Sequence, residues 1–151
     1  MLGSTITFHA DTSGKSTLEA FELTARLVAA SDIVSPVLRA RIRDRTPVGR
    51  GGHAGRLRDS VTAQRRTSIG WVRLEFHSKV PYAPYVIKGT KPHTILPVAA
   101  RMLHWTTPDG QDVFARRVQH PGTKANNYPR RAASDLMPFI ALTYHQALSR
   151  R

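Results

Sequence analysis

Apolar residues recur at helical spacing near both ends of the chain. The first such stripe follows a capping serine or threonine at 16–17 and consists of Leu18, Phe21, Ala25 and Val28. The helix is predicted to pause at 30–35, where Ser35 and Pro36 would cap a second helix over 36–45. A final helix is predicted over 129–149, with its own apolar stripe: Ala133, Leu136, Met137, Ile140, Tyr144, Ala147 and Leu148.

Between the helices the apolar period shortens to two, which predicts strands. Residues 60–78 are expected to form a hairpin that turns at 67–70, because Val72, Leu74 and Phe76 alternate with Arg73, Glu75 and His77. Two more strands are predicted over 102–107 and 111–119, with Pro108-Asp109-Gly110 as the turn between them. Helices at both ends of about four antiparallel strands predict an α+β fold, with 1–151 as a single domain and 1–15 as a polar lead segment.

The remaining segments are long loops. Residues 46–56 hold four glycines between positions 49 and 55 and cannot form a stable helix or strand interior. Residues 79–97 carry prolines at 81, 84, 92 and 97, so they cannot pair continuously in a sheet. Loops of this length in a compact domain are usually functional or bound to a partner. We therefore expect these segments, with 120–128, to become ordered against other chains.

Composition excludes several classes of protein. The 151 residues are 40% hydrophobic and contain no cysteine, which rules out disulfides, thiol nucleophiles and Cys-ligated zinc. No apolar run approaches the roughly 20 residues of a membrane span, and no secretory signal is visible at the start. No metal or cofactor site is predicted.

The formal charge of +13 is unevenly distributed. Residues 1–35 carry a net charge of −2, whereas residues 36–66 carry +7. Arginine, which binds phosphate and carboxylate through a fork of donors, provides 18 of the 23 cations. A polyanion or an acidic protein surface is the simplest partner, and a solvated basic surface is the alternative.

Candidate catalytic chemistry is sparse. Glu75 and His77 share one face of a predicted strand and would suit an acid/base pair, although an exposed sheet face explains them equally well. His93 and His120 lie in proline-rich loops that can meet in space. A small RNA-binding protein or toxin-type ribonuclease using Arg73, His77 and Arg116 is one alternative reading, and a DNA-compacting protein is another.

Three segments in sequence order carry a resemblance to a known family. They are Thr46-Pro47-Val48 with Gly55-Arg56-Leu57-Arg58-Asp59-Ser60-Val61; Tyr82-Ala83-Pro84-Tyr85-Val86 with Gly89-Thr90 and Pro92-His93; and Val113-Phe114-Ala115 with Val118 and His120-Pro121-Gly122-Thr123-Lys124-Ala125, followed by Tyr128 and Arg130-Arg131. In their order and spacing, these segments resemble the small neck or tail-completion proteins of long-tailed bacteriophages, which include head–tail joining proteins and minor tail protein Z types.

The resemblance implies a non-enzymatic virion protein, present in the host cytoplasm before assembly. It would form a ring, with six copies favoured by tail symmetry, between the head connector or stopper and the tail terminator or tube. Genomic DNA would pass through the ring without its bases being read. Expected subunit contacts are Tyr82, Tyr85, Gly89, Thr90, His120, Gly122 and Thr123. Arginines expected to face DNA, or acidic groups of a neighbour, are Arg50, Arg56, Arg65 and Arg66.

Overall fold

The computed structural model describes residues 4–49 and 54–149. The chain divides into two compact units. Unit 1 consists of Met1–Ala83 and Asn127–Arg151, and unit 2 is the intervening Pro84–Asn126. The architecture is α+β, with long helices near both ends and small antiparallel sheets, as predicted. The single sheet of about four strands is not formed, because the strands divide into sheets of three, two and two strands.

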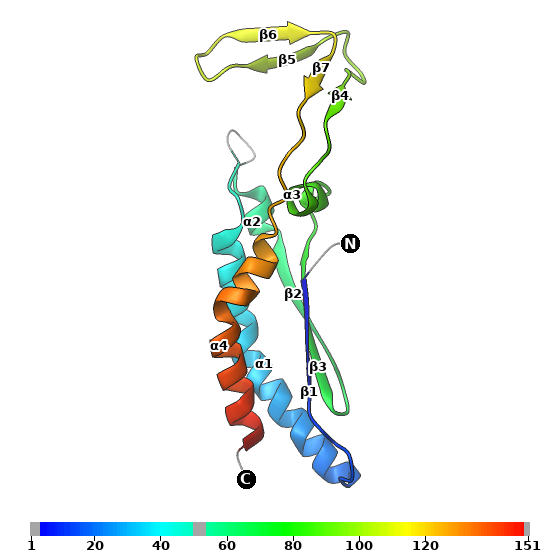
Figure 1. Ribbon diagram of the computed structural model, residues 1–151, viewed down its shortest axis with the longest axis vertical. Helices are drawn as coiled ribbons and strands as arrows, with labels where there is room; N and C mark the ends of the chain where they lie inside the picture. The colour runs from blue at the N-terminus through cyan, green and yellow to red at the C-terminus, as the bar shows by residue number, and fades with distance from the viewer. Residues whose placement is uncertain (1–3, 50–53, 150–151) are drawn as a thin grey trace. The chain divides into compact units, whose positions relative to one another are not determined.

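The N-terminal helix of unit 1, α1, runs unbroken over Thr17–Arg45 (Figure 1). Of the two predicted capping residues, Ser16 is the N-cap, and it forms a capping box with Glu19 in which each side chain bonds the other residue's backbone N–H. The predicted pause and second N-cap are wrong, since Pro36 lies inside the helix. The reason is packing: the buried side chains continue at helical spacing through the predicted break, and they are Leu27, Ala30, Val34, Leu38 and Ile42.

The three-stranded sheet of unit 1 has the order β1-β3-β2 and is antiparallel throughout. β2 (Val61–Ser68) and β3 (Trp71–Ser78) form the predicted hairpin around Gly70, whose φ of 80° places it in the left-handed region. The lead segment is not a free end, because Ser4–His9 forms β1 on the far side of β3.

The core of unit 1 lies between this sheet and the two long helices. α4 (Tyr128–Ser149) runs beside α1, and both cover the sheet face that carries Val72, Leu74 and Phe76 (Figure 1). Phe8 of β1 stacks on Tyr144 of α4 with ring centroids 3.6 Å apart. Of the stripe predicted for α4, Ile140 and Tyr144 are buried, whereas Met137 is 49% exposed. A short helix, α2 (Arg56–Asp59), precedes β2. In the described parts of the chain no helix is long and apolar enough to cross a membrane.

Unit 2 is built from short elements. α3 (Ala83–Lys88) leads into it from unit 1, and the predicted turn at 107–111 joins β5 (Leu103–Thr106) to β6 (Asp112–Ala115). The strand predicted over 111–119 is interrupted at 116–117, and its second part, β7 (Val118–His120), pairs with β4 (His93–Ile95). β4 lies inside the proline-rich connection, where no strand was predicted, and it is only three residues long because prolines stand on both sides of it.

Candidate functional site

Five of the seven predicted contact residues lie together in unit 2, where two segments of the chain run antiparallel. We call residues 89–95 and 118–125 the stem. Its base is a bridge between Thr90 and Thr123, in which each backbone N–H donates to the other carbonyl, at 3.0 and 3.1 Å. The Thr90 hydroxyl also accepts from the Thr123 N–H at 3.0 Å. These residues therefore contact each other within one chain.

Two glycines allow the stem segments to approach this closely. Gly89 and Gly122 have φ angles of 73° and 87°, in the region that side-chain-bearing residues avoid. A Cβ on Gly89 would lie 2.7 Å from the Ala125 nitrogen and nearer still to the Thr123 carbonyl oxygen. A Cβ on Gly122 would lie 2.9 Å from the Lys91 carbonyl carbon. Both positions require glycine for two independent reasons: backbone conformation and space.

His93 and His120, which the sequence places in loops that can meet, lie together in the structure. The two residues are directly opposite each other in the β4–β7 ladder, with ring centroids 5.0 Å apart. Gly122 donates its N–H to His120 Nδ1 at 3.0 Å, so that nitrogen acts as an acceptor. His93 Nδ1 lies 2.8 Å from the Lys91 carbonyl oxygen. The pair thus binds the stem backbone, and the described residues contain no group of three or more candidate metal ligands.

One side of the stem lines an open hollow of about 540 Å³. Its lining is Tyr85, Gly89, Thr90, Lys91, Pro92 and His93. Tyr85 is exposed along this hollow, and Tyr82, the remaining predicted contact residue, is an exposed residue of unit 1. A hollow of this size is large enough for one or more side chains of another protein.

The β5–β6 hairpin exposes apolar side chains that were not predicted as contact residues. Phe114 is 59% exposed and Trp105 is 40% exposed, and the segment before the hairpin exposes Leu96, Val98 and Met102. His104 stacks on Phe114 at 4.6 Å and lies 3.0 Å from the Asp112 carboxylate. Hydrogen bonds from Thr106, which has the larger effect, and from His104 lower the pKa of Asp112. The hairpin is therefore internally ordered while its apolar side chains remain uncovered.

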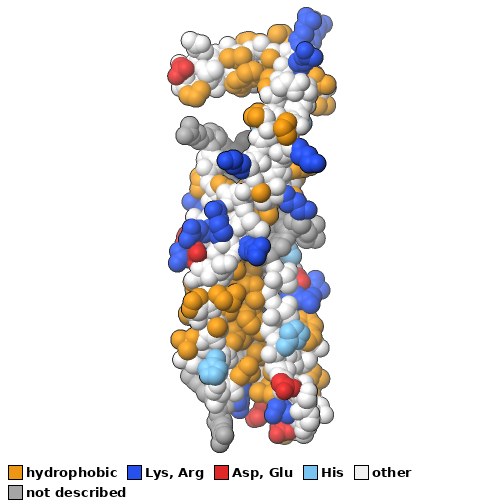
Figure 2. Space-filling view, viewed as in Figure 1, with side chains coloured by type: hydrophobic (Ala, Val, Ile, Leu, Met, Phe, Trp, Pro, Cys, Tyr) orange, Lys and Arg blue, Asp and Glu red, His pale blue; other side chains and the backbone are white. Residues whose placement is uncertain are grey.

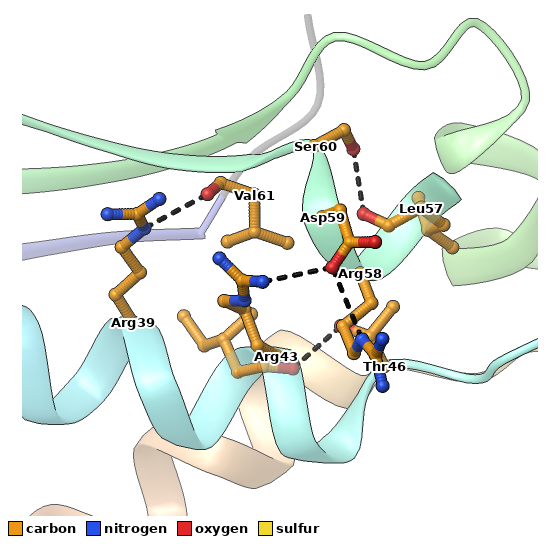
Figure 3. A network of polar contacts seen from close by, with 9 residues as sticks. Arg39, Arg43, Thr46, Leu57, Arg58, Asp59, Ser60 and Val61 are labelled. Atoms are coloured by element: carbon orange, nitrogen blue, oxygen red, sulfur yellow. Dashed lines mark hydrogen bonds and ion pairs between the residues drawn. The ribbon is translucent and has the colours of Figure 1, made fainter. Parts of the chain in front are cut away.

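The first family-like segment forms a clip at one end of unit 1 (Figure 3). Asp59 accepts from Arg43 at 2.9 Å and from Arg58 at 3.3 Å, and Arg39 Nε donates to the Val61 carbonyl at 3.1 Å. The buried Thr46 donates its hydroxyl to the Ile42 carbonyl at 2.6 Å. These contacts tie α1 to α2 and to the start of β2.

The arginines predicted to face DNA do not share one surface. Arg65 and Arg66 are adjacent on β2 and so point to opposite faces of the sheet. Arg65 pairs with Asp32 of α1 and bonds Ser31, whereas Arg66 Nε donates to Glu75 at 3.2 Å. The acidic group that Arg65 pairs with therefore belongs to its own chain. Arg56 lies on α2, and Arg50 lies outside the described residues.

The open face of the three-stranded sheet carries the alternative catalytic residues. His77 Nε2 lies 3.5 Å from Glu75 Oε2, and the buried His77 Nδ1 has no hydrogen-bond partner among the described residues. Arg73 donates to the Thr7 hydroxyl at 3.2 Å and lies 5.3 Å from the centre of the Trp71 ring. Arg116, the third residue of that hypothesis, belongs to unit 2.

No family model, curated protein or solved structure matches this chain.

Proposed function

We propose that the chain is a structural virion protein of a tailed phage. It completes the tail or neck as a subunit of a ring and joins it to the DNA-filled head, without catalysis. The observation that carries this proposal is the absence of a core in unit 2. None of its 43 residues, Pro84–Asn126, is buried, whereas every buried hydrophobic residue found in the described chain belongs to unit 1.

A segment of this kind gains little from folding alone. Fixing the backbone costs about 1–2 kcal/mol per residue, and two-stranded ladders without a covered face are marginal in water. Covering an exposed Phe or Trp side chain contributes about 1.5–3 kcal/mol. Trp105 and Phe114, together with the hollow beside Tyr85, therefore offer another subunit the contacts that unit 2 lacks.

The family resemblance supplies the form of the assembly. In a closed ring each subunit presents two different surfaces to its two neighbours. Tail symmetry favours six copies, with the head connector or stopper on one side and the tail terminator or tube on the other. The ring would assemble from subunits in the host cytoplasm and then form part of the virion.

Light scattering on the purified chain, with and without tails that lack it, tests the proposal. The expected result is a low mass alone and a ring-sized increase on tails. The double variant Trp105→Ser/Phe114→Ser should keep its fold but fail to join tails. Ile69→Ser, which removes a comparably exposed apolar side chain from the hairpin turn of unit 1, should join normally. A wild-type chain that ignores tails would overturn the proposal.

A second candidate function rests on the Glu75–His77 pair. Its 3.5 Å separation, with Arg66 and Arg73 on the same sheet face, would suit a metal-independent ribonuclease. RNA cleavage that is abolished by His77→Ala would favour this function over the structural role. Absence of cleavage at high protein concentration would exclude it.

A further inference from the structure

Three elements bring a concentration of arginine to one end of unit 1. The elements are the last two turns of α1 (39–46), α2 (56–59) and the first two turns of α4 (128–135), and we call them together the arginine end. Its charged residues are Arg39, Arg41, Arg43, Arg45, Arg56, Arg58, Arg130 and Arg131 against Asp44, Asp59 and Asp135. The net charge is therefore +5. Figure 2 shows Lys and Arg side chains over this part of unit 1, and several acidic side chains at its opposite end.

Ion pairs within the chain hold these elements together, but some of their arginines have no acidic partner among the described residues. Arg45 pairs with Asp135 at 2.7 Å, which joins α1 to α4, and Asp59 is shared by Arg43 and Arg58. Arg41, Arg56 and Arg130 are exposed and make no ion pair with any residue in 4–49 or 54–149.

The start of α4 is charged against its own dipole. A helix N-terminus carries partial positive charge and favours acidic side chains. α1 obeys this rule, with Glu19 in its first turn and Arg43 and Arg45 in its last. The first turn of α4 contains no acidic residue, and Arg130 and Arg131 stand there instead. Asn127 Oδ1 accepts the Arg130 N–H at 3.3 Å, and the exposed Arg130 side chain adds positive charge where the helix dipole already favours an anion.

A second copy of the chain is a poor source of that anion. The opposite end of unit 1, residues 10–26, contains three acids against two cations, a net charge of −1. Acidic groups there cannot offset +5. The described arginine end also exposes no large hydrophobic side chain, although protein interfaces usually have an apolar centre depleted of charge.

We propose that the arginine end binds the phosphate backbone of duplex DNA without reading its sequence. Arginine matches phosphate through paired donors, whereas single-strand binding depends on stacking against aromatic rings, and the three elements of the arginine end expose none. This inference deepens the proposed function, because the duplex would be the genome inside the ring. It replaces Arg65 and Arg66 with Arg41 and Arg130 beside Arg56 as the residues nearest the phosphates.

Salt dependence gives the expected magnitude. Each phosphate neutralised on duplex DNA contributes about −0.9 to the slope of log K against log salt concentration. Contacts from Arg41, Arg56 and Arg130 should therefore give a slope of about −3 for the isolated chain. Removing two of them should reduce the slope by about 2.

The experiment measures binding of the full chain to a fluorescein-labelled mixed-sequence duplex by anisotropy at several salt concentrations. The test variant is Arg41→Gln/Arg130→Gln. The matched control is Arg116→Gln/Arg117→Gln, which removes the same charge from unit 2. The test variant should bind more weakly with a shallower slope, and the control should behave as wild type. Circular dichroism on both variants checks that the fold is retained.

Three results would overturn the inference. Equal weakening in both variants would show that binding follows total charge, and an unchanged test variant would show that this end does not contact DNA. Preferential binding of polyglutamate over DNA would instead identify an acidic protein surface as the partner. The assay uses the isolated chain, so its outcome is independent of whether the chain joins tails.

Discussion

Replacing Gly89 by alanine adds one carbon atom at the point where the two stem segments lie closest. The added Cβ would stand 2.7 Å from the Ala125 nitrogen, which is closer than non-bonded carbon and nitrogen atoms approach. The Ala125 nitrogen and the Thr123 carbonyl oxygen, which would lie nearest to the added Cβ, are both backbone atoms and cannot turn aside as a flexible side chain could. The chain must therefore move, and the Thr90–Thr123 bridge is the contact it would lose.

The expected cost follows from two parts. A left-handed backbone conformation costs a residue with a side chain about 1–2 kcal/mol. Each of the two bridge hydrogen bonds contributes about 0.5–1.5 kcal/mol. Gly89→Ala should therefore destabilise the stem by about 2–5 kcal/mol. Gly110→Ala is the matched control, since Gly110 has a φ of 82° with no atom near its Cβ position. It should cost only about 1–2 kcal/mol, for the left-handed backbone conformation.

Hydrogen exchange followed by mass spectrometry measures the effect locally. The amides of Thr90 and Thr123 should exchange at least about 30-fold faster in Gly89→Ala, since every 1.4 kcal/mol is tenfold. Amides in α1 should exchange as in wild type, because no buried residue of unit 1 is touched. Equal acceleration in Gly110→Ala, or none in Gly89→Ala, would refute the argument from close approach.

Three further predictions concern unit 1. Leu27→Ala should lower the free energy of unfolding by about 2–5 kcal/mol in a denaturant titration, because this fully buried side chain leaves a cavity. Asp59→Asn should cost less than about 1 kcal/mol, since its ion pairs are largely exposed, and a double-mutant cycle with Arg43→Gln isolates the pair. Bonds from Ser16 lower the pKa of Glu19, so the capping contribution is present above the ordinary Glu pKa and lost as pH falls through the lowered one. Glu19→Gln should therefore flatten the acid side of a melting-temperature profile, and an unchanged profile would contradict this assignment.

The parts of the fold that follow from local pattern were predictable. The β2–β3 hairpin and the turn at 107–111 have short-range alternation and turn residues that specify them. The break predicted in α1 was wrong because a proline inside a helix costs about 3 kcal/mol, less than the combined gain from burying Val34, Leu38 and Ile42 at about 1.5–3 kcal/mol each. β1 was missed although Ile6 and Phe8 alternate with polar residues, because so short an alternation does not show which strand it pairs with, and its partner lies more than 60 residues away.

The sequence likewise indicated one part of the candidate site and not the other. Five of the predicted subunit-contact residues lie together within one chain, where Gly89 and Gly122 are positions at which the backbone itself requires glycine, and their contact with another subunit stays a prediction. The apolar side chains of the β5–β6 hairpin were not predicted as contact residues. The sequence pattern of an alternating strand is the same whether its apolar face is covered by its own chain or left exposed, and Phe114 is exposed.

Unit 2 is inserted between β3 and α4, and this placement separates two kinds of mutational constraint. Substitutions within 84–126 leave every buried hydrophobic residue of unit 1 in place, so they can alter recognition without lowering the stability of the remaining fold. Gly89 and Gly122 are the exceptions within the insertion, because a side chain at either position would collide with the backbone of the opposite stem segment. Related chains should therefore differ most in the hairpin and least at these two glycines. This division allows such a protein to acquire new assembly partners while its core sequence stays constant.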